Sequence, residues 1–173
     1  MGGRVDRFDG FAEFARTRGP ALTRMAFLLS GNPHTAEELV QEAFVRVAVR
    51  WRRVVAAGDP EAYVRGIIVN QHISRWRRTT RKERVVAEPP DRVVADPAEG
   101  SARRIDIMTA LDTLSPRQRS VLLLRFFMDL SEAEIARTLG CSVGNVKRHA
   151  SDALRRLRAV APGLIDAERE VVR

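Results

Sequence analysis

The sequence predicts an all-α protein made of two small helical domains joined by a flexible linker. Hydrophobic residues make up 45% of the 173 residues, which is enough for helical cores, whereas aromatic residues make up only 6%. Alternating runs of the residue types that favour strands are scarce, and apolar residues instead recur with the period of a helix. We therefore divide the chain into a domain over residues 1–80, a linker over 81–103, a domain over 104–162 and a tail over 163–173.

The first domain is expected to begin with two helices. An apolar stripe predicts a helix from Phe8 to Leu29, which Gly19-Pro20 would kink or split because proline removes a backbone hydrogen bond. Asn32-Pro33 supplies an N-cap followed by a proline at the first helical position. The second helix is therefore expected to start there and to continue as far as Trp51.

A loop from Val54 to Gly58 is expected next. Asp59-Pro60 repeats the signal for the start of a helix, and the third helix extends to Arg78 with a basic end. The apolar side chains expected to face the core from this helix are Tyr63, Ile67, Ile68 and Ile73.

The stretch from Thr79 to Ala102 is rich in proline and mixed charge and has no sustained apolar period, so it predicts the linker. The second domain starts with a helix from Ile105 to Leu114. Ser115 to Gln118 then forms a capping box with proline at the first helical position. The helix that it opens is expected to bury Val121, Leu122, Leu124 and Phe127.

The segment from Ser131 to Leu157 has the spacing of a helix-turn-helix. Ser131 with Glu134 forms a capping box ahead of the first helix, and Ser142 with Asn145 repeats an N-cap ahead of the second. The small contact residue, the turn residue and the apolar residue that two crossed helices need are Ala136, Gly140 and Val146.

The second of these helices has one apolar face and one polar face. The apolar face is formed by Val146, Ala150, Ala153, Leu154 and Leu157. The outward set is Asn145, Lys147, Arg148, Ser151, Asp152 and Arg155. Such a set suits base edges and phosphates, which predicts binding to duplex DNA. The alternative is a solvated polar face on an ordinary helical hairpin.

The net charge of +8 favours a polyanion as partner, such as nucleic acid, although an anionic membrane or an acidic protein would also fit. A single cysteine, Cys141, excludes an internal disulfide, and the three scattered histidines offer no zinc-binding pattern. We expect no metal, cofactor or small-molecule substrate. The chain shows neither an apolar run of membrane-spanning length nor a secretory signal, so no membrane association and a cytoplasmic location are expected.

Three segments together resemble the extracytoplasmic-function class of the sigma-70 family, the promoter-recognition subunits of bacterial RNA polymerase. They are AEELVQEAFVRV at 36–47, PEAYVRGIIVNQHISRWRR at 60–78 and LSPRQRSVLLLRFFMDLSEAEIARTLGCSVGNVKRHASDALRRLR at 114–158. The first is similar to the polymerase-binding helix of the family, the second to its minus-ten helix and the third to its minus-thirty-five domain. The details most resemble short, SigE-like actinobacterial members.

The resemblance implies a set of contacts for each segment. The polymerase-binding residues would be Glu37, Glu38, Gln41 and Glu42, whose acidic face would meet a basic coiled coil in the clamp of the largest polymerase subunit. The polymerase flap is a second expected contact. A solvated helix flank is the alternative explanation of the acidic face.

The minus-ten element would be read and opened by a group of aromatic, amide, hydroxyl and arginine side chains. They are Trp51, Arg52, Arg53, Asn70, Gln71, Ser74, Arg75, Trp76, Arg77 and Arg78. Opening requires a pocket for an unstacked base, placed in the loop before Asp59, and cations for the displaced strand. Trp51 and Trp76 could equally be core or corner aromatics, and Asn70 could brace its helix.

The minus-thirty-five element would be read by the second helix of the helix-turn-helix. Its contact residues would be Ser142, Asn145, Lys147, Arg148, Ser151 and Arg155. The common family pattern GTVKSR is GNVKRH here, so the promoter sequence of other members does not transfer. His149, which belongs to this departure, contacts phosphate or packs near the start of the helix.

The sequence thus predicts an alternative sigma factor without enzymatic activity, associated with the nucleoid during initiation. The family resemblance adds an anti-sigma factor as a candidate partner. A conventional helix-turn-helix regulator that binds DNA without polymerase is the main rival, but it would lack the first domain. A helical enzyme acting on nucleic acid is disfavoured because the sequence has no phosphate-binding loop and no nucleophile with a base.

Overall fold

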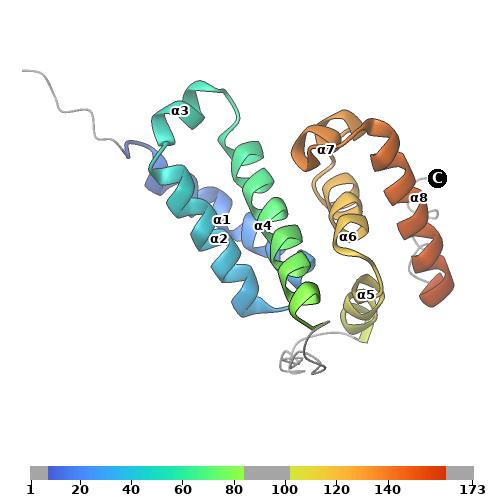
Figure 1. Cartoon of the computed structure of the whole chain (residues 1–173). Coiled ribbons are helices and arrows are strands. Elements are labelled where there is room, and N and C mark those ends of the chain that lie inside the picture. The colour runs from blue at the N-terminus through green and yellow to red at the C-terminus, as the bar shows by residue number, and fades with distance from the viewer. Residues whose placement is uncertain (1–7, 84–101, 163–173) are drawn as a thin grey trace, which may run out of the picture. The chain divides into compact units, whose positions relative to one another are not determined.

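A computed structural model describes the backbone of residues 8–83 and 102–162, and the side chains of 8–79 and 107–162. These residues form helices and connecting turns with no strand among them, which confirms the predicted all-α class (Figure 1). The chain divides into two compact units, Met1–His72 and Ile73–Arg173.

The first unit begins with helix α1, Phe11–Ser30, and α2, Pro33–Ala48. Pro20 lies inside α1 without splitting it, so of the two predicted effects of this residue, a kink or a split, the split is wrong. Asn32 caps α2 as predicted, because its Oδ1 accepts a hydrogen bond of 3.0 Å from the Thr35 N–H. The two helices pack on each other through fully or almost fully buried side chains, among them Leu22, Met25, Leu29, Leu39, Ala43 and Val47.

Helix α3, Trp51–Ala56, corrects two predictions. The second predicted helix ends at Ala48 instead of reaching Trp51, and most of the predicted loop from Val54 to Gly58 is helical. Val54 is buried, which gives α3 an apolar contact with the rest of the unit and explains why this short segment folds as a helix.

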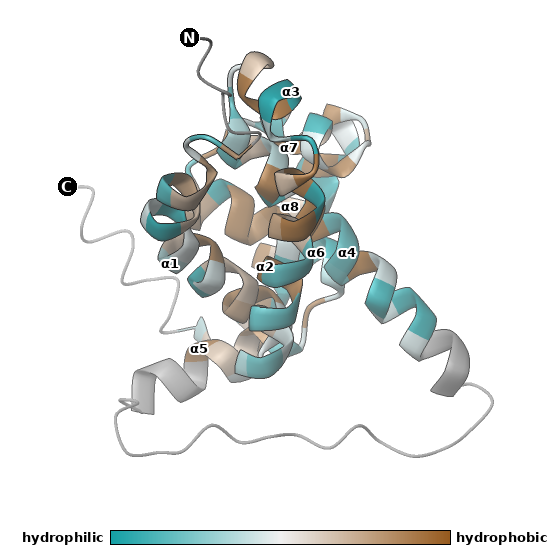
Figure 2. Cartoon of the chain, turned by 90° about the vertical axis from the view of Figure 1, so that its left-hand side faces the viewer, coloured by the Kyte–Doolittle hydropathy of each residue, from teal (hydrophilic) through white to brown (hydrophobic). Residues whose placement is uncertain are grey.

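Helix α4, Pro60–Glu83, is capped by Asp59, whose Oδ1 accepts a hydrogen bond of 2.8 Å from the Ala62 N–H. Its buried apolar side chains are Val64, Ile68, Val69 and Ile73. Tyr63 is 42% exposed, so its predicted place in the core is wrong. The later described turns of α4 are mainly hydrophilic (Figure 2), and the helix continues beyond residue 80, where the linker was expected to begin.

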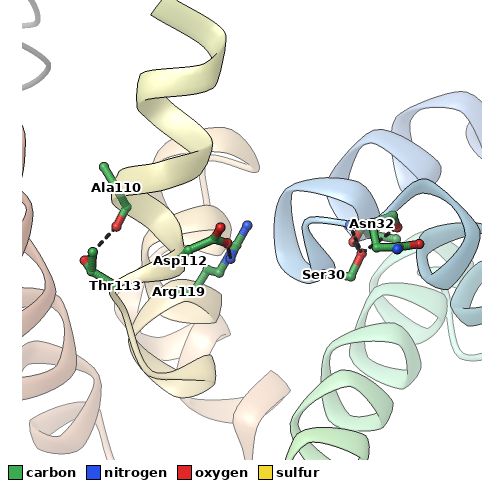
Figure 3. A network of polar contacts seen from close by, with 7 residues as sticks. Ser30, Asn32, Ala110, Asp112, Thr113 and Arg119 are labelled. Carbon is green, nitrogen blue, oxygen red and sulfur yellow. Dashed lines mark hydrogen bonds and ion pairs between the residues drawn. The ribbon is translucent and has the colours of Figure 1, made fainter. Parts of the chain in front are cut away.

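The second unit includes the end of α4 and continues with α5, Ala102–Asp112, followed by α6, Pro116–Leu122, and the π-helix η1, Leu123–Phe127. The predicted capping box at Ser115 is present in both directions. Arg119 of α6 is buried and points to Asp112, with 2.8 Å between Nη1 and Oδ1 (Figure 3). Phe127, predicted to be buried, is 44% exposed because the π-turn shifts the register of the side chains.

The helix-turn-helix consists of α7, Glu132–Leu139, and α8, Val143–Val160. Both predicted caps form, at Ser131 and at Ser142. Gly140 adopts the left-handed conformation, with φ of 60°, that ends α7 and allows the turn. Val146, Ala150 and Ala153 are buried as predicted. The predicted tail over 163–173 and most of the linker lie outside the described residues.

Candidate polymerase and DNA interfaces

One face of α2 is acidic and exposed. The predicted polymerase-binding residues Glu37, Glu38, Gln41 and Glu42 all lie at the surface. The Glu38 carboxylate also lies close to the His34 imidazole, with 3.3 Å between Oε1 and Nε2. Sequence reasoning missed two exposed valines that extend this stripe, Val45 at 66% and Val49 at 57% exposure. Their helical spacing from Glu38 and Glu42 was the signal that could have identified them.

Trp51 belongs to the core of the first unit. Its side chain is 6% exposed, and its Nε1 donates a hydrogen bond of 2.6 Å to the carbonyl oxygen of Asp9. The indole also packs against Phe11 and Phe14, with centroids 5.3 Å and 5.1 Å away. Of the two predictions that the sequence left open, this geometry favours the core aromatic.

The remaining minus-ten candidates differ in exposure. Arg52, Arg53, Asn70, Trp76, Arg77 and Arg78 are exposed, whereas Ser74 and Arg75 are half-buried. Gln71 is only 8% exposed, and its amide atoms make no hydrogen bond within the described structure, so this conformation does not present Gln71 to a ligand. Tyr63, which the sequence assigned to the core, is instead an exposed aromatic at the start of α4.

A charged cluster fixes the start of α4 against α1. Arg18 of α1 lies 3.2 Å from Glu61, measured from Nε to Oε2, and Arg65 lies 4.0 Å from the other carboxylate oxygen. Arg65 is 8% exposed, so the carboxylate compensates a buried cation. The cluster holds the helix that carries most of the minus-ten candidates.

The exposed face of α8 presents nearly all of the predicted minus-thirty-five residues. Asn145, Lys147, Arg148, Ser151 and Arg155 are exposed on it, and Ser142 is exposed at its start. The Ser142 hydroxyl accepts a hydrogen bond of 3.2 Å from the Asn145 N–H, so this side chain has a structural role in starting the helix. The rest of the set remains open to solvent on a single helix.

Contacts with earlier elements brace both flanks of α8. On one flank, Glu132 of α7 lies 3.7 Å from Lys147 and 3.1 Å from Arg125 of η1. On the other flank, His149 is half-buried. Burial lowers the pKa of His149, and the positive charges of Arg148 and Arg117 lower it further, against an opposing effect of Asp152. These contacts orient the helix in which the predicted DNA-reading residues lie.

The described residues also limit other kinds of site. They contain no group of three or more histidine, cysteine, aspartate or glutamate side chains placed to hold a metal ion. Within the same part of the chain, each helix is too short or too polar to cross a bilayer.

Two family models match the chain in the order of the two units. Sigma-70 region 2 matches residues 14–82, and sigma-70 region 4 matches residues 104–157. The chain is 38% identical to an RNA polymerase sigma-E factor of Streptomyces avermitilis over 86% of its own length and 83% of that protein. The chain therefore belongs to the sigma-70 family.

Further relatives indicate which class of sigma-70 factor the chain belongs to. The chain is 34% identical to the ECF RNA polymerase sigma factor SigE of Mycolicibacterium smegmatis, over 78% of this chain and 55% of that protein. Its fold is similar to the sigma factor RpoE of Bartonella quintana, solved in complex with the anti-sigma factor NepR, with a TM-score of 0.76 and 26% identity over 88% of this chain and 97% of that one. It is an extracytoplasmic-function sigma factor, as its sequence motifs predicted.

Proposed function

We propose that this sigma factor binds core RNA polymerase, recognises minus-thirty-five and minus-ten promoter elements and promotes the initiation of transcription. The observation that supports this best is the order of three exposed surfaces on one chain: the acidic face of α2, the arginine-rich end of α4 and the polar face of α8. A DNA-binding regulator needs only the last of these surfaces. The chain performs no catalysis itself and needs no cofactor in this function.

The acidic face of α2 is the proposed contact with the clamp of the largest polymerase subunit. Glu38 and Glu42 supply negative charge, while Val45 and Val49 supply apolar area that costs little to desolvate when it is covered. The exposed pair Phe126 and Phe127 of η1 is the proposed apolar contact with the polymerase flap.

The minus-ten element is proposed to bind along α3 and α4. Arg52, Arg53, Arg77 and Arg78 are exposed cations that suit the phosphates of a separated strand. Because Trp51 is buried, the aromatic surfaces that suit an unstacked base are those of Tyr63, 42% exposed, and Trp76, 47% exposed. Asn70 supplies an exposed amide for the edge of a base.

The minus-thirty-five element is proposed to receive α8 in its major groove. Asn145 and Arg148 are placed to contact base edges, whereas Lys147 and Arg155 suit phosphates. An anti-sigma factor is a further proposed partner, supported by the solved complex of the similar sigma factor RpoE of Bartonella quintana with the anti-sigma factor NepR. The proposed place of action is the nucleoid, in the cytoplasm.

Transcription in vitro tests the function. The purified chain, added to core polymerase from its own organism, should start transcripts from promoters of that genome, and polymerase alone should not. Glu42→Lys should weaken binding to core polymerase about tenfold, because it reverses a charge on the acidic face. Glu13→Lys makes the same change on the exposed surface of α1 and should have no effect. DNA binding that is independent of polymerase, without initiation, would instead favour a conventional regulator.

A further inference from the structure

Asp152 is an anion in the middle of a surface that is otherwise built for a polyanion. It is the one acidic residue of α8, a helix that also contains Lys147, Arg148, Arg155, Arg156 and Arg158. Its exposed neighbours at helical spacing are Asn145 and Arg148 before it and Arg155 and Arg156 after it, so it lies on their face of the helix, with the half-buried His149 at the edge of that face. A carboxylate there repels nearby phosphates, so phosphate binding does not account for it.

Stability of the helix does not supply that role. Asp152 pairs with Arg155 through Oδ1 and Nη2, but the two side chains are 34% and 76% exposed. Exposed pairs three residues apart on a helix contribute little to folding because water screens them and their side chains lose entropy. The Asp152 carboxylate therefore has a weak structural use and a marked electrostatic cost in DNA binding.

The chemistry of the carboxylate points to a base. An ionised carboxylate can accept about four hydrogen bonds, and Arg155 occupies one of these positions. In the major groove, the amino group of cytosine is a donor that a carboxylate accepts. Guanine O6 and N7 and thymine O4 are acceptors that a carboxylate repels, and adenine places an acceptor beside its amino group.

We propose that Asp152 is a specificity-determining residue of the minus-thirty-five interface, which accepts a hydrogen bond from a cytosine amino group and rejects the other bases at that position. This inference rests on the proposed function of α8. A preference for cytosine would come from the Asp152 carboxylate alone, because the arginines and the Asn145 amide on the same face of α8 would not impose it.

The test uses holoenzyme assembled from core polymerase and the full chain, with a promoter library randomised over the minus-thirty-five element. The unmodified chain should select cytosine at one position. Asp152→Asn should reduce that preference about tenfold, because loss of the charge also ends the repulsion of acceptor bases. Glu13→Gln removes the same charge from a comparable carboxylate and arginine pair on α1, with Arg16, and should leave every preference unchanged.

A second variant, Arg155→Gln, distinguishes a direct contact between Asp152 and the base from an effect of Asp152 on the position of Arg155. Arg155→Gln should keep the cytosine preference if Asp152 contacts the base itself. Identical selection profiles for Asp152→Asn and Arg155→Gln would overturn the proposal, since Asp152 would then act through Arg155. A uniform gain of affinity on all sequences would also overturn it and leave only phosphate repulsion.

The same experiment distinguishes a failure of the Asp152 proposal from a failure of the proposed function of α8. Holoenzyme with the unmodified chain that selects no DNA sequence would refute both proposals at once. Selection by the unmodified chain with the same profile for Asp152→Asn would refute only the role of Asp152. Circular dichroism should give the same helix content for both proteins, because the Asp152–Arg155 pair is exposed.

Discussion

The ion pair between the buried Arg119 and the partly exposed Asp112 should hold α5 to α6. Arg119 is 6% exposed, and its guanidinium lies 2.8 Å from the Asp112 carboxylate. Burial lowers the pKa of Arg119, while the hydrogen bond and charge of Asp112 act in the opposite direction. The neighbouring hydrogen bond from Thr113 to the carbonyl of Ala110, 2.7 Å long, ends α5 at the same corner (Figure 3).

The strength of this ion pair follows from the distance between the two groups and from how far each side chain is exposed to water. Coulomb attraction at 2.8 Å amounts to about 6 kcal/mol in an effective dielectric of about 20. Desolvation of the guanidinium cancels part of this attraction, and the Asp112 side chain is 36% exposed, so water screens it further. We expect Asp112→Asn to lower the free energy of unfolding of the second unit by about 2 kcal/mol, because it leaves a buried charge poorly compensated.

Hydrogen exchange of amides in α6 and α8 is the suitable measurement, because both tryptophans precede α5 and their fluorescence would not report on the helices from α5 to α8. Arg119→Met combined with Asp112→Asn should recover most of the loss, since the double variant buries no charge. The exposed pair of Glu13 and Arg16, at 4.0 Å, is the matched control and should show no measurable coupling. Single effects at Arg119 and Asp112 that simply add would refute the reasoning.

Three further predictions concern single side chains. The pKa of His149 is lowered in the folded protein, so the unfolded chain binds more protons near pH 6.5 and stability should fall as pH drops from 8 to 6; His149→Gln should flatten this dependence in urea titrations followed by circular dichroism. Trp51→Ala should lower the free energy of unfolding of the first unit by about 3–5 kcal/mol, and Trp51→Phe should lower it by about 1 kcal/mol. An alanine variant that folds normally but cannot open promoters would contradict the assignment of Trp51 to the core. Gly140→Ala should destabilise the second unit by about 1–2 kcal/mol because of its φ of 60° alone, since a Cβ there would meet no atom within 4 Å. Gly140→Asn should destabilise it less, and urea titrations of both variants would compare the two.

The elements that sequence predicted correctly are those with local causes. Asn32, Asp59, Ser115, Ser131 and Ser142 each start a helix through a side chain that accepts from an N–H within three residues, so the signal lies in adjacent letters. The faces of α8 followed equally from the period of its apolar residues.

The errors have non-local causes. The break between α2 and α3 has neither proline nor glycine to mark it, and it depends on Trp51 turning into the core against Phe11 and Phe14. Burial of Gln71 and exposure of Tyr63 depend on packing around α4 that a helical period cannot resolve. The candidate surfaces were therefore predictable as segments, whereas their individual side chains were not.

The π-helix η1 gives the second unit a place where chain length can change. The Met128 N–H bonds to the Leu123 carbonyl, five residues back, at 3.1 Å, so this turn holds one residue more than an α-helical turn. Deleting Phe126 would let the helix close with ordinary spacing and keep α7 in its orientation. An alignment of distant relatives should accordingly place a single-residue gap within Leu123–Phe127 and leave the lengths of α7 and α8 unchanged.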